Sequence, residues 1–419
     1  MERWNPWWRG EPDPTYLAWA SLPVKWVPDE VDMLPLEPFA LNFVHGPRQV
    51  GKTTMLKLLI NKLLNRVEPR AILYLSCDEF SDYEELGEVL DDYLRARLAW
   101  GISHTYIFLD EVTFVKEWWR AIKARIDDGS LRGSVVTVTG SASMELLRQR
   151  EYFPGRRGRG RDITMMPLGF HSYMKKIHGL ELMTVHHLDE IDKVMAGNRI
   201  YGESLSKHFN AYLETGGFPL AIREMKEVGR VSEGAKKTLL DGFRSDWLRI
   251  GKSESAMKEV IAYLIRARAA PISWLSISKN TSLSSPHTAR SYVEVLENLM
   301  IVTTLNFLEP GGRVVYRKNK KIHFTDPFIY RTLAEYCQAR VDEDALVEGV
   351  VASHLSRNYR IYYWRNSTEV DCLVDEDGEY YGFEVKWGVK EGRKPRWPRH
   401  VTLLTKDTIP LFLSSLPFA

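Results

Sequence analysis

Cysteine is scarce in this sequence, and none of it lies in a spacing that suggests zinc or a disulfide framework. Cys77, Cys337 and Cys372 are far apart and form no CxxC or Cys/His pattern, so a reducing compartment is expected. No apolar run approaches the roughly 20 residues that span a bilayer, and the first residues lack the apolar segment of a signal peptide. We therefore expect a cytoplasmic protein without a membrane partner.

A surplus of one charge sign is also absent. The 57 Lys and Arg side chains are nearly balanced by 55 Asp and Glu, for a net charge of +2, so any basic surface must be local. Hydrophobic residues make up 44% of the 419 positions, which is typical of a folded globular protein. At about 150 residues per domain, this length predicts roughly two to four domains.

Tryptophan, in contrast, is abundant. There are 13 in the chain, and several lie in the opening "MERWNPWWRG". Packing is the commoner role of tryptophan, and stacking on nucleic-acid bases is the alternative. We interpret residues 1–38 as a Trp- and Pro-rich arm that docks on a neighbouring domain.

The stretch "FALNFVHGPRQVGKTTMLKLL" predicts a buried strand, a glycine-rich loop and a helix. It fits the pattern GxxxxGK[ST] in the context that a phosphate-binding loop requires. Loop N–H groups bind phosphate, the lysine lies between β- and γ-phosphate oxygens, and the hydroxyl binds magnesium. The sequence thus predicts ATP and Mg²⁺ as cofactors. The predicted nucleotide-binding residues are Gly46, Pro47, Arg48, Gln49, Val50, Gly51, Lys52, Thr53 and Thr54, of which Lys52 is also catalytic and Thr53 is also a metal ligand.

A second apolar strand, in "TYIFLDEVTFV", delivers Asp110 and Glu111 at its carboxyl end. Asp110 is predicted to hold the magnesium through water, and Glu111 to orient and deprotonate the water that attacks the γ-phosphate. A surface acid pair is the alternative. The run "SVVTVTGSAS" ends a further strand at Thr139, Gly140 and Ser141, and a polar residue there, Ser141 in particular, is predicted to touch the γ-phosphate, although Thr and Ser also end strands for turn reasons.

The loop "FPGRRGRGRD" places several arginines between glycines. Arg156 would act as a finger that neutralises transition-state charge in a neighbouring subunit, which makes a homo-oligomer one hypothesis. Contact with phosphodiester backbones and a plain solvated loop are the alternatives. These three interpretations stay open at this point.

Several segments together carry a family resemblance: "GPRQVGKTTMLK", "IFLDEVTFVKEWWRAIKARIDDG", "VTVTGSASMEL", "GRRGR", "MPLGFHSYM" and "YLETGGFPLAI". From Phe39 onward the chain resembles prokaryotic and archaeal AAA-like P-loop ATPases with a C-terminal domain of unknown function 4143. In related signal-transducing ATPases a Gly-x-Pro of the helical lid lies against adenine, and Gly217 to Pro219 has this pattern. The resemblance implies that Pro219 contacts the nucleotide. The arm departs from the Arg-containing helix that such relatives carry there.

The predicted fold is α/β: an AAA-like core with a parallel sheet, a helical lid, a winged helix and a restriction-endonuclease-like α/β domain. The expected parts are the arm at 1–38, the ATPase core at 39–167, the lid at 168–250, the winged helix at 251–310 and the nuclease-like domain at 311–419. In the winged helix, His287, Arg290 and Ser291 would face outward, with "RKNKK" (317–321) as a basic wing. DNA contact and a role as a protein connector both stay open.

The resemblance implies a PD-(D/E)XK-like core at the C-terminus. There Glu348 on a helix, Asp371 at a strand end, and Glu384 and Lys386 on the next strand would converge. Asp371 and Glu384 would bind the metal, and Lys386 would position water. We therefore expect ATP hydrolysis to move a module that interacts with nucleic acid, DNA in particular. The alternative is an ATP-dependent switch or scaffold for protein partners, with an inactive nuclease-like domain.

Overall fold

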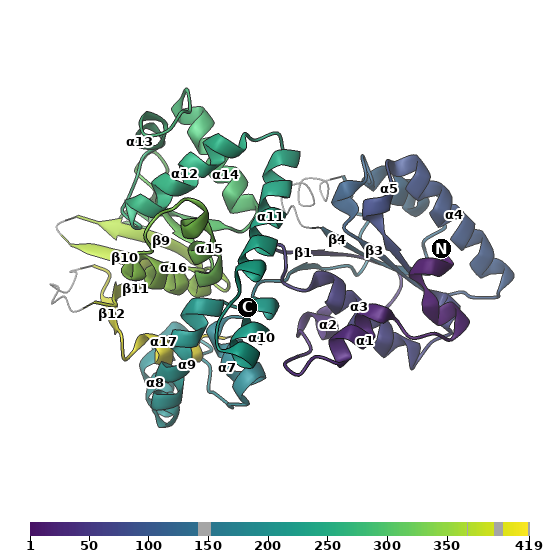
Figure 1. The fold of residues 1–419 in the computed structure, drawn as a ribbon, viewed down its shortest axis with the longest axis horizontal. Helices are drawn as coiled ribbons and strands as arrows, with labels where there is room; N and C mark the ends of the chain where they lie inside the picture. Colours follow the sequence, from purple (N-terminus) through teal and green to yellow (C-terminus); the bar gives the residue numbers. More distant parts are fainter. Residues whose placement is uncertain (141–151, 367, 389–396, 418–419) are drawn as a thin grey trace. The chain divides into compact units, whose positions relative to one another are not determined.

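The computed structural model describes residues 1–140, 152–366, 368–388 and 397–417 (Figure 1). The chain forms two compact units, residues 1–165 and 166–419, which we call the N-terminal unit and the C-terminal unit. The finer five-part division stays a prediction.

The N-terminal unit is built on a parallel sheet that, within the described residues, has five strands in the order β2-β3-β4-β1-β5. Every residue of β1 and β4 is buried, as expected for central strands covered on both faces. The predicted α/β core with a parallel sheet is therefore confirmed. The strands are β1 (Ala40–His45), β2 (Ile72–Ser76), β3 (Thr105–Asp110), β4 (Ser134–Gly140) and β5 (Asp162–Thr164).

Helices cover both faces of this sheet. Figure 1 shows α1 and α2 packed around α3 on one face, and α4 beside α5 on the other. The helices are α1 (Pro14–Ala20), α2 (Glu30–Met33), α3 (Lys52–Leu64), α4 (Tyr83–Ala99) and α5 (Trp119–Asp127). The short 3₁₀ turns are η1 (Glu2–Trp4), η2 (Pro6–Arg9), η3 (Pro69–Ala71), η4 (Cys77–Glu79) and η5 (Val112–Phe114).

The N-terminal arm docks on the sheet edge, as its composition predicts. The Asn5 side chain accepts from the Tyr74 N–H at 2.7 Å and donates to the Tyr74 carbonyl at 3.0 Å. The indole N–H groups of Trp7 and Trp8 donate to the Ile72 carbonyl at 3.2 and 2.8 Å. Because β2 is an edge strand, these side chains satisfy backbone groups that another strand would otherwise pair.

Replacing Asn5 by Ala leaves the N–H and carbonyl of Tyr74 buried without their partners. We expect the free energy of unfolding to fall by about 1–3 kcal/mol, measured by urea denaturation. Arg9→Ala is the control, because Arg9 pairs only with the exposed Glu11. Equal effects of the two variants would contradict the assigned role of Asn5.

The C-terminal unit begins with a group of helices. In the part of the chain that the structure describes, no helix is long and apolar enough to cross a membrane. The helices are α7 (Phe170–His178), α8 (Ile191–Asn198), α9 (Gly202–Thr215), α10 (Pro219–Val228), α11 (Glu233–Arg249), α12 (Glu254–Ala267), α13 (Trp274–Lys279), α14 (Pro286–Asn298), α15 (Pro327–Tyr336), α16 (Glu343–Ser356) and α17 (Ile409–Ser415), with the 3₁₀ turns η6 (Leu188–Glu190) and η7 (Arg199–Tyr201).

A mixed sheet forms the other part of this unit. Over the described residues its order is β12-β11-β10-β9-β6-β7, with β8 also paired to β6. Its strands are β6 (Val302–Leu308), β7 (Val314–Val315), β8 (Lys321–Phe324), β9 (Arg360–Arg365), β10 (Glu369–Glu376), β11 (Glu379–Lys386) and β12 (His400–Thr405). Helix α16 packs on β8 to β11.

The segment 251–324 has the helix and strand order predicted for a winged helix, with α12, α13 and α14 before the antiparallel pair β6 and β8. Strand β6 also pairs with β9 of the mixed sheet. The winged-helix assignment stays a prediction, but the basic wing was wrong for two of its lysines. Lys320 and Lys321 are buried, with 7% and 2% of each residue exposed.

Candidate functional site

The predicted phosphate-binding loop runs from the end of β1 to the start of α3. Gly51, at φ 100°, is the N-cap of α3, and this backbone conformation favours glycine. Gly46 is required for another reason, because a Cβ there would lie 2.1 Å from the Met165 carbonyl oxygen. Gly46 therefore allows the loop to pass close to the Met165 backbone, and Gly51 allows the turn that leads directly into α3.

Lys52 is buried at the start of α3, and its Nζ donates to the carbonyls of Gly46 and Pro47 at 3.1 and 2.9 Å. The ammonium thus lies in the concave side of the loop, where phosphate oxygens would compete for it. Val50 is buried and Gln49 is exposed. The remaining predicted residues lie along the same loop and first turn: Arg48, 5.7 Å from the Phe114 ring centroid, and the half-buried Thr54.

Asp110 is the centre of the hydrogen-bond network at this edge. Strands β1, β3 and β4 are parallel, so their carboxyl ends lie together. The Thr53 hydroxyl donates to Asp110 Oδ2 at 2.6 Å, and the Tyr74 hydroxyl donates to the same oxygen at 2.8 Å. The Thr139 hydroxyl donates to Asp110 Oδ1. Hydroxyl and carboxylate oxygens are the kind of hard ligands that Mg²⁺ prefers.

Glu111 follows with a left-handed backbone, at φ 56° and ψ 42°. This conformation costs a residue other than glycine about 1–3 kcal/mol and is common at functional sites. It is held by the Glu111 N–H, which donates to the Thr139 hydroxyl at 3.0 Å. Thr139 therefore positions both acids.

Sequence reasoning did not predict Tyr74 in this network, and it did not predict that Thr139 contacts the two acids. Thr139 lies at the end of β4, where the sequence analysis expected a γ-phosphate contact from Ser141, a residue outside the described range. Tyr74 lies in the interior of β2 and carries no sequence signal, because its contact depends on the register with β3.

A buried ion pair connects the arm to this network. Lys57 Nζ lies 3.0 Å from Asp13 Oδ2, and the two side chains are only 6% and 8% exposed. The same ammonium lies 3.2 Å from the Tyr74 ring centroid. Burial lowers the pKa of Lys57, and the Asp13 carboxylate opposes that effect. A chain of contacts thus leads from Asp13 through Lys57 and Tyr74 to Asp110.

Lys57→Met leaves the Asp13 carboxylate buried without its cation. We expect a loss of about 3–5 kcal/mol in the free energy of unfolding, and a smaller loss in the double variant with Asp13→Asn, which keeps an acceptor for the Tyr16 N–H. The matched control on α3 is Lys62→Met, which removes an exposed pair with Asp32. Urea denaturation that gives similar losses for both lysines would refute the buried pair's importance.

The predicted arginine finger lies in a loop with three arginines that are paired within the N-terminal unit. Arg156 Nε lies 2.5 Å from Asp127 Oδ1, Arg157 pairs with Asp162, and Arg159 pairs with Glu37. Such half-exposed pairs are weak enough to exchange, so the finger stays a prediction.

Pro219 is the first residue of α10 in the C-terminal unit. The Gly217 N–H just before it donates to Asp326 Oδ2 at 2.9 Å, which fixes this turn. The predicted adenine contact of Pro219 also stays a prediction.

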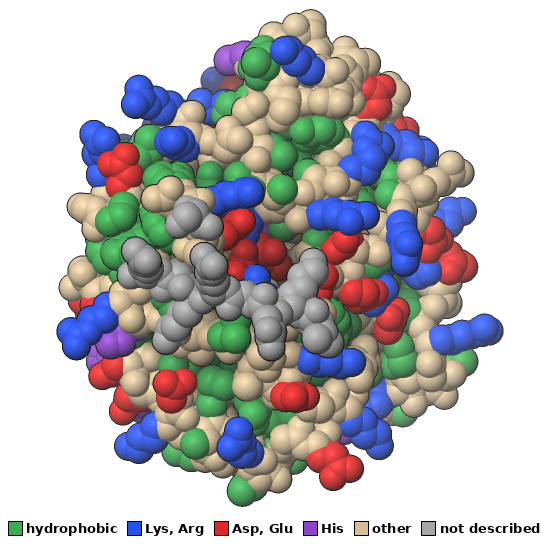
Figure 2. All heavy atoms as spheres, turned by 90° about the vertical axis from the view of Figure 1, so that its left-hand side faces the viewer, with side chains coloured by type: hydrophobic (Ala, Val, Ile, Leu, Met, Phe, Trp, Pro, Cys, Tyr) green, Lys and Arg blue, Asp and Glu red, His purple; other side chains and the backbone are tan. Residues whose placement is uncertain are grey.

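The four residues implied for the nuclease-like site lie in one region of the C-terminal unit. Glu348 is on α16, Asp371 on β10, and Glu384 and Lys386 share a face of β11, with Lys386 Nζ 2.6 Å from Glu384 Oε1. Asp371 Oδ2 accepts from the Val385 N–H at 2.9 Å. Figure 2 shows one face of the molecule, on which acidic side chains gather in a hollow with Lys and Arg around it.

Lys321, from β8, completes this carboxylate cluster, and sequence reasoning had placed it elsewhere. Its Nζ lies 2.5 Å from Glu348 Oε1, 2.6 Å from Asp371 Oδ1 and 2.9 Å from Glu369 Oε1. Burial raises the pKa of Glu348, and the Asp371 charge raises it further. Burial would also raise the pKa of Asp371, but Lys321 holds it below its usual value.

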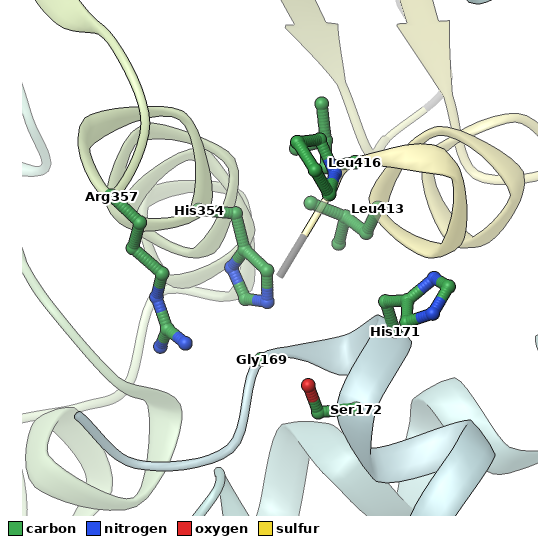
Figure 3. Close-up of a pocket in the computed structure, with 8 residues that line it drawn as sticks. Gly169, His171, Ser172, His354, Arg357, Leu413 and Leu416 are labelled. Atoms are coloured by element: carbon green, nitrogen blue, oxygen red, sulfur yellow. The ribbon is translucent and has the colours of Figure 1, made fainter. Parts of the chain in front are cut away.

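A cavity of about 10 Å³ lies beside α7, α16 and α17 (Figure 3). On its wall, His354 Nε2 accepts from the Phe170 N–H at 2.8 Å while Nδ1 contacts the Val350 carbonyl at 2.7 Å. Burial lowers the pKa of His354 to about 3, so this histidine is neutral. A space of this size fits about one water, and the histidine has a packing role.

The strand order, the loop and the Asp110 network have the arrangement expected of a P-loop domain. Family models agree with this class: residues 39–174 match a model described as an AAA domain. Over these residues, most of which lie in the N-terminal unit, the chain is therefore similar to AAA-type P-loop domains. Residues 206–340 match a domain of unknown function (DUF8612), and residues 343–408 match the domain of unknown function (DUF4143) that the sequence resemblance indicated.

Individual relatives are distant. The uncharacterized protein MJ1637 of Methanocaldococcus jannaschii is 25% identical in an alignment of 394 residues, gaps included, that covers 84% of this chain and 77% of that protein. The Aeropyrum pernix ORC2 protein, solved as ADPNP-ADP complexes, is 12% identical at a TM-score of 0.39, over 72% of this chain and 89% of that chain. AMPPCP-bound DnaA from Aquifex aeolicus is 13% identical at a TM-score of 0.26, over 68% of this chain and 92% of that chain. The assignment above rests on the family model and the loop.

Proposed function

We propose that this protein binds ATP with Mg²⁺ and hydrolyses it to change the conformation of its C-terminal unit. The observation that carries the proposal is the 2.6 Å contact between the Thr53 hydroxyl and Asp110, beside the buried Lys52. Thr53 and Asp110 would hold Mg²⁺, whose charge would offset the negative charge on the phosphate oxygens. Lys52 would exchange its loop carbonyls for β- and γ-phosphate oxygens.

Glu111 would take the proton of the attacking water. Its backbone N–H donates to the Thr139 hydroxyl, which holds this residue next to Asp110, and a position fixed in advance needs less reorganisation in the transition state. Tyr74 and Thr139 would keep Asp110 in the orientation that binds the metal, which is a positioning role.

Lys52→Ala and Glu111→Gln should separate binding from chemistry. We expect Lys52→Ala to lose ATP affinity, while Glu111→Gln keeps the Kd for ATP and loses about 10²- to 10⁴-fold in kcat. Calorimetry and phosphate release measure the two quantities. Glu117→Gln is the control, since this acid pairs with Arg120 on the surface. Full hydrolysis by Glu111→Gln would contradict its assigned role.

For the partner, the proposal is nucleic acid, DNA in particular, with a protein scaffold role as the second candidate. Support for DNA comes from Arg317 and Lys318, which are exposed and follow α14 and β6 along the chain, where a winged helix carries its wing. The side-chain contacts of α14 favour the scaffold role. Arg290 pairs with Glu294 at 2.7 Å, and Ser291 accepts from Lys252 at 2.6 Å. Two of the three groups that were expected to face DNA thus already have partners, while the third, His287, is exposed.

Steady-state ATP hydrolysis with and without duplex DNA at low salt distinguishes the two candidates. If DNA is the partner, we expect stimulation that is lost when Arg317 and Lys318 are both replaced by Ala and that weakens as salt rises. Arg313→Ala is the control, because Arg313 is paired with Glu309. An unchanged rate and no DNA binding would favour the scaffold.

A further inference from the structure

Lys321 occupies the centre of the carboxylate cluster in the C-terminal unit. Its ammonium has three N–H donors and no acceptor, and carboxylates of Glu348, Glu369 and Asp371 lie within 2.9 Å of it. These partners come from α16 and β10, while Lys321 itself comes from β8. A single cation thus joins separate elements around one point.

The cluster holds this ammonium in its charged form. Only 2% of the Lys321 side chain is exposed, and burying an unpaired ammonium would cost several kcal/mol. Burial alone would lower the pKa of Lys321, but the surrounding carboxylates raise it well above its ordinary value. The positive charge and the acids therefore depend on each other.

A divalent ion does not fit this arrangement. Mg²⁺ takes oxygen ligands at about 2.0–2.1 Å in an octahedron and keeps several waters. Here Lys321 Nζ lies 2.6 Å from Asp371 Oδ1, and the other oxygen of that carboxylate accepts the Val385 N–H. Lys386 Nζ likewise contacts Glu384. In the described residues, no group of three or more metal-ligating side chains is placed to hold an ion.

We infer that the Lys321 ammonium takes the place of the divalent cation in the PD-(D/E)XK-like carboxylate cluster, so that this cluster is complete without metal and does not cut phosphodiesters. The inference concerns a site separate from the phosphate-binding loop and stands whether or not the protein hydrolyses ATP. Of the two interpretations of the nuclease-like residues, an active metal site and an inactive domain, the inference favours the inactive domain, with the cluster as a metal-free structural core.

The test measures Mn²⁺ binding by the full chain without nucleotide, and electron paramagnetic resonance detects the bound Mn²⁺. Lys321→Met keeps the length of the side chain and removes its charge. We expect this variant to bind one more Mn²⁺ than the wild type, and to be stabilised by Mn²⁺ in thermal unfolding. The double variant Lys321→Met, Glu348→Gln should weaken this new site by about 10-fold or more.

Lys320→Met is the matched control. Lys320 is the neighbouring buried lysine, but its Nζ donates to the carbonyls of Tyr316 and Lys318, so its loss should create no Mn²⁺ site. A wild-type protein whose Mn²⁺ binding falls when Asp371 is replaced by Asn would overturn the inference.

A second measurement on the wild type keeps the inference testable if Lys321→Met does not fold. DNA is incubated with the wild-type protein in Mg²⁺ or Mn²⁺, and we expect no cleavage. Metal-dependent cleavage that is lost in Asp371→Asn and kept in Lys52→Ala would overturn the inference.

Discussion

The hydrogen bonds of Asp110 are the contacts on which the N-terminal unit depends. A buried carboxylate is stable only when its oxygens are satisfied, and here Thr53, Tyr74 and Thr139 supply the donors. Each comes from a different element, so the network requires the parallel register of β2, β3 and β4 and the start of α3. The same register that builds the core therefore also builds the site.

The arm extends this dependence to the start of the chain. Asn5 pairs with the backbone of the edge strand at Tyr74, and Asp13 neutralises the ammonium that lies against the Tyr74 ring. Tyr74 is thus held from its backbone and from its ring, and its hydroxyl reaches Asp110. A segment distant in sequence contributes to the geometry of the phosphate site without touching it.

Much of the N-terminal unit follows from the sequence. The loop glycines, Lys52 and the acids after β3 have local spacings that specify their chemistry, and the apolar strands specify a buried parallel sheet. Tyr74 and Lys321 could not be found in this way. Their roles depend on which strands pair and on what lies opposite, and a lysine in "RKNKK" has the same local pattern whether it faces water or carboxylates.

The buried carboxylates of the two units are compensated by different kinds of groups. At Asp110, neutral hydroxyl groups surround a carboxylate whose charge can still attract a cation. At Asp371, a buried ammonium already supplies that charge. By our proposals, the carboxylate at Asp110 binds Mg²⁺, whereas the cluster at Asp371 carries its own cation.

Calorimetric titration of the full wild-type chain with ATP, in Mg²⁺ and then in EDTA, tests the central claim most directly. The account predicts binding of a single nucleotide that tightens with Mg²⁺, and loss of this tightening in Asp110→Asn. The absence of nucleotide binding, or Mg²⁺ dependence that survives in Asp110→Asn, would contradict it.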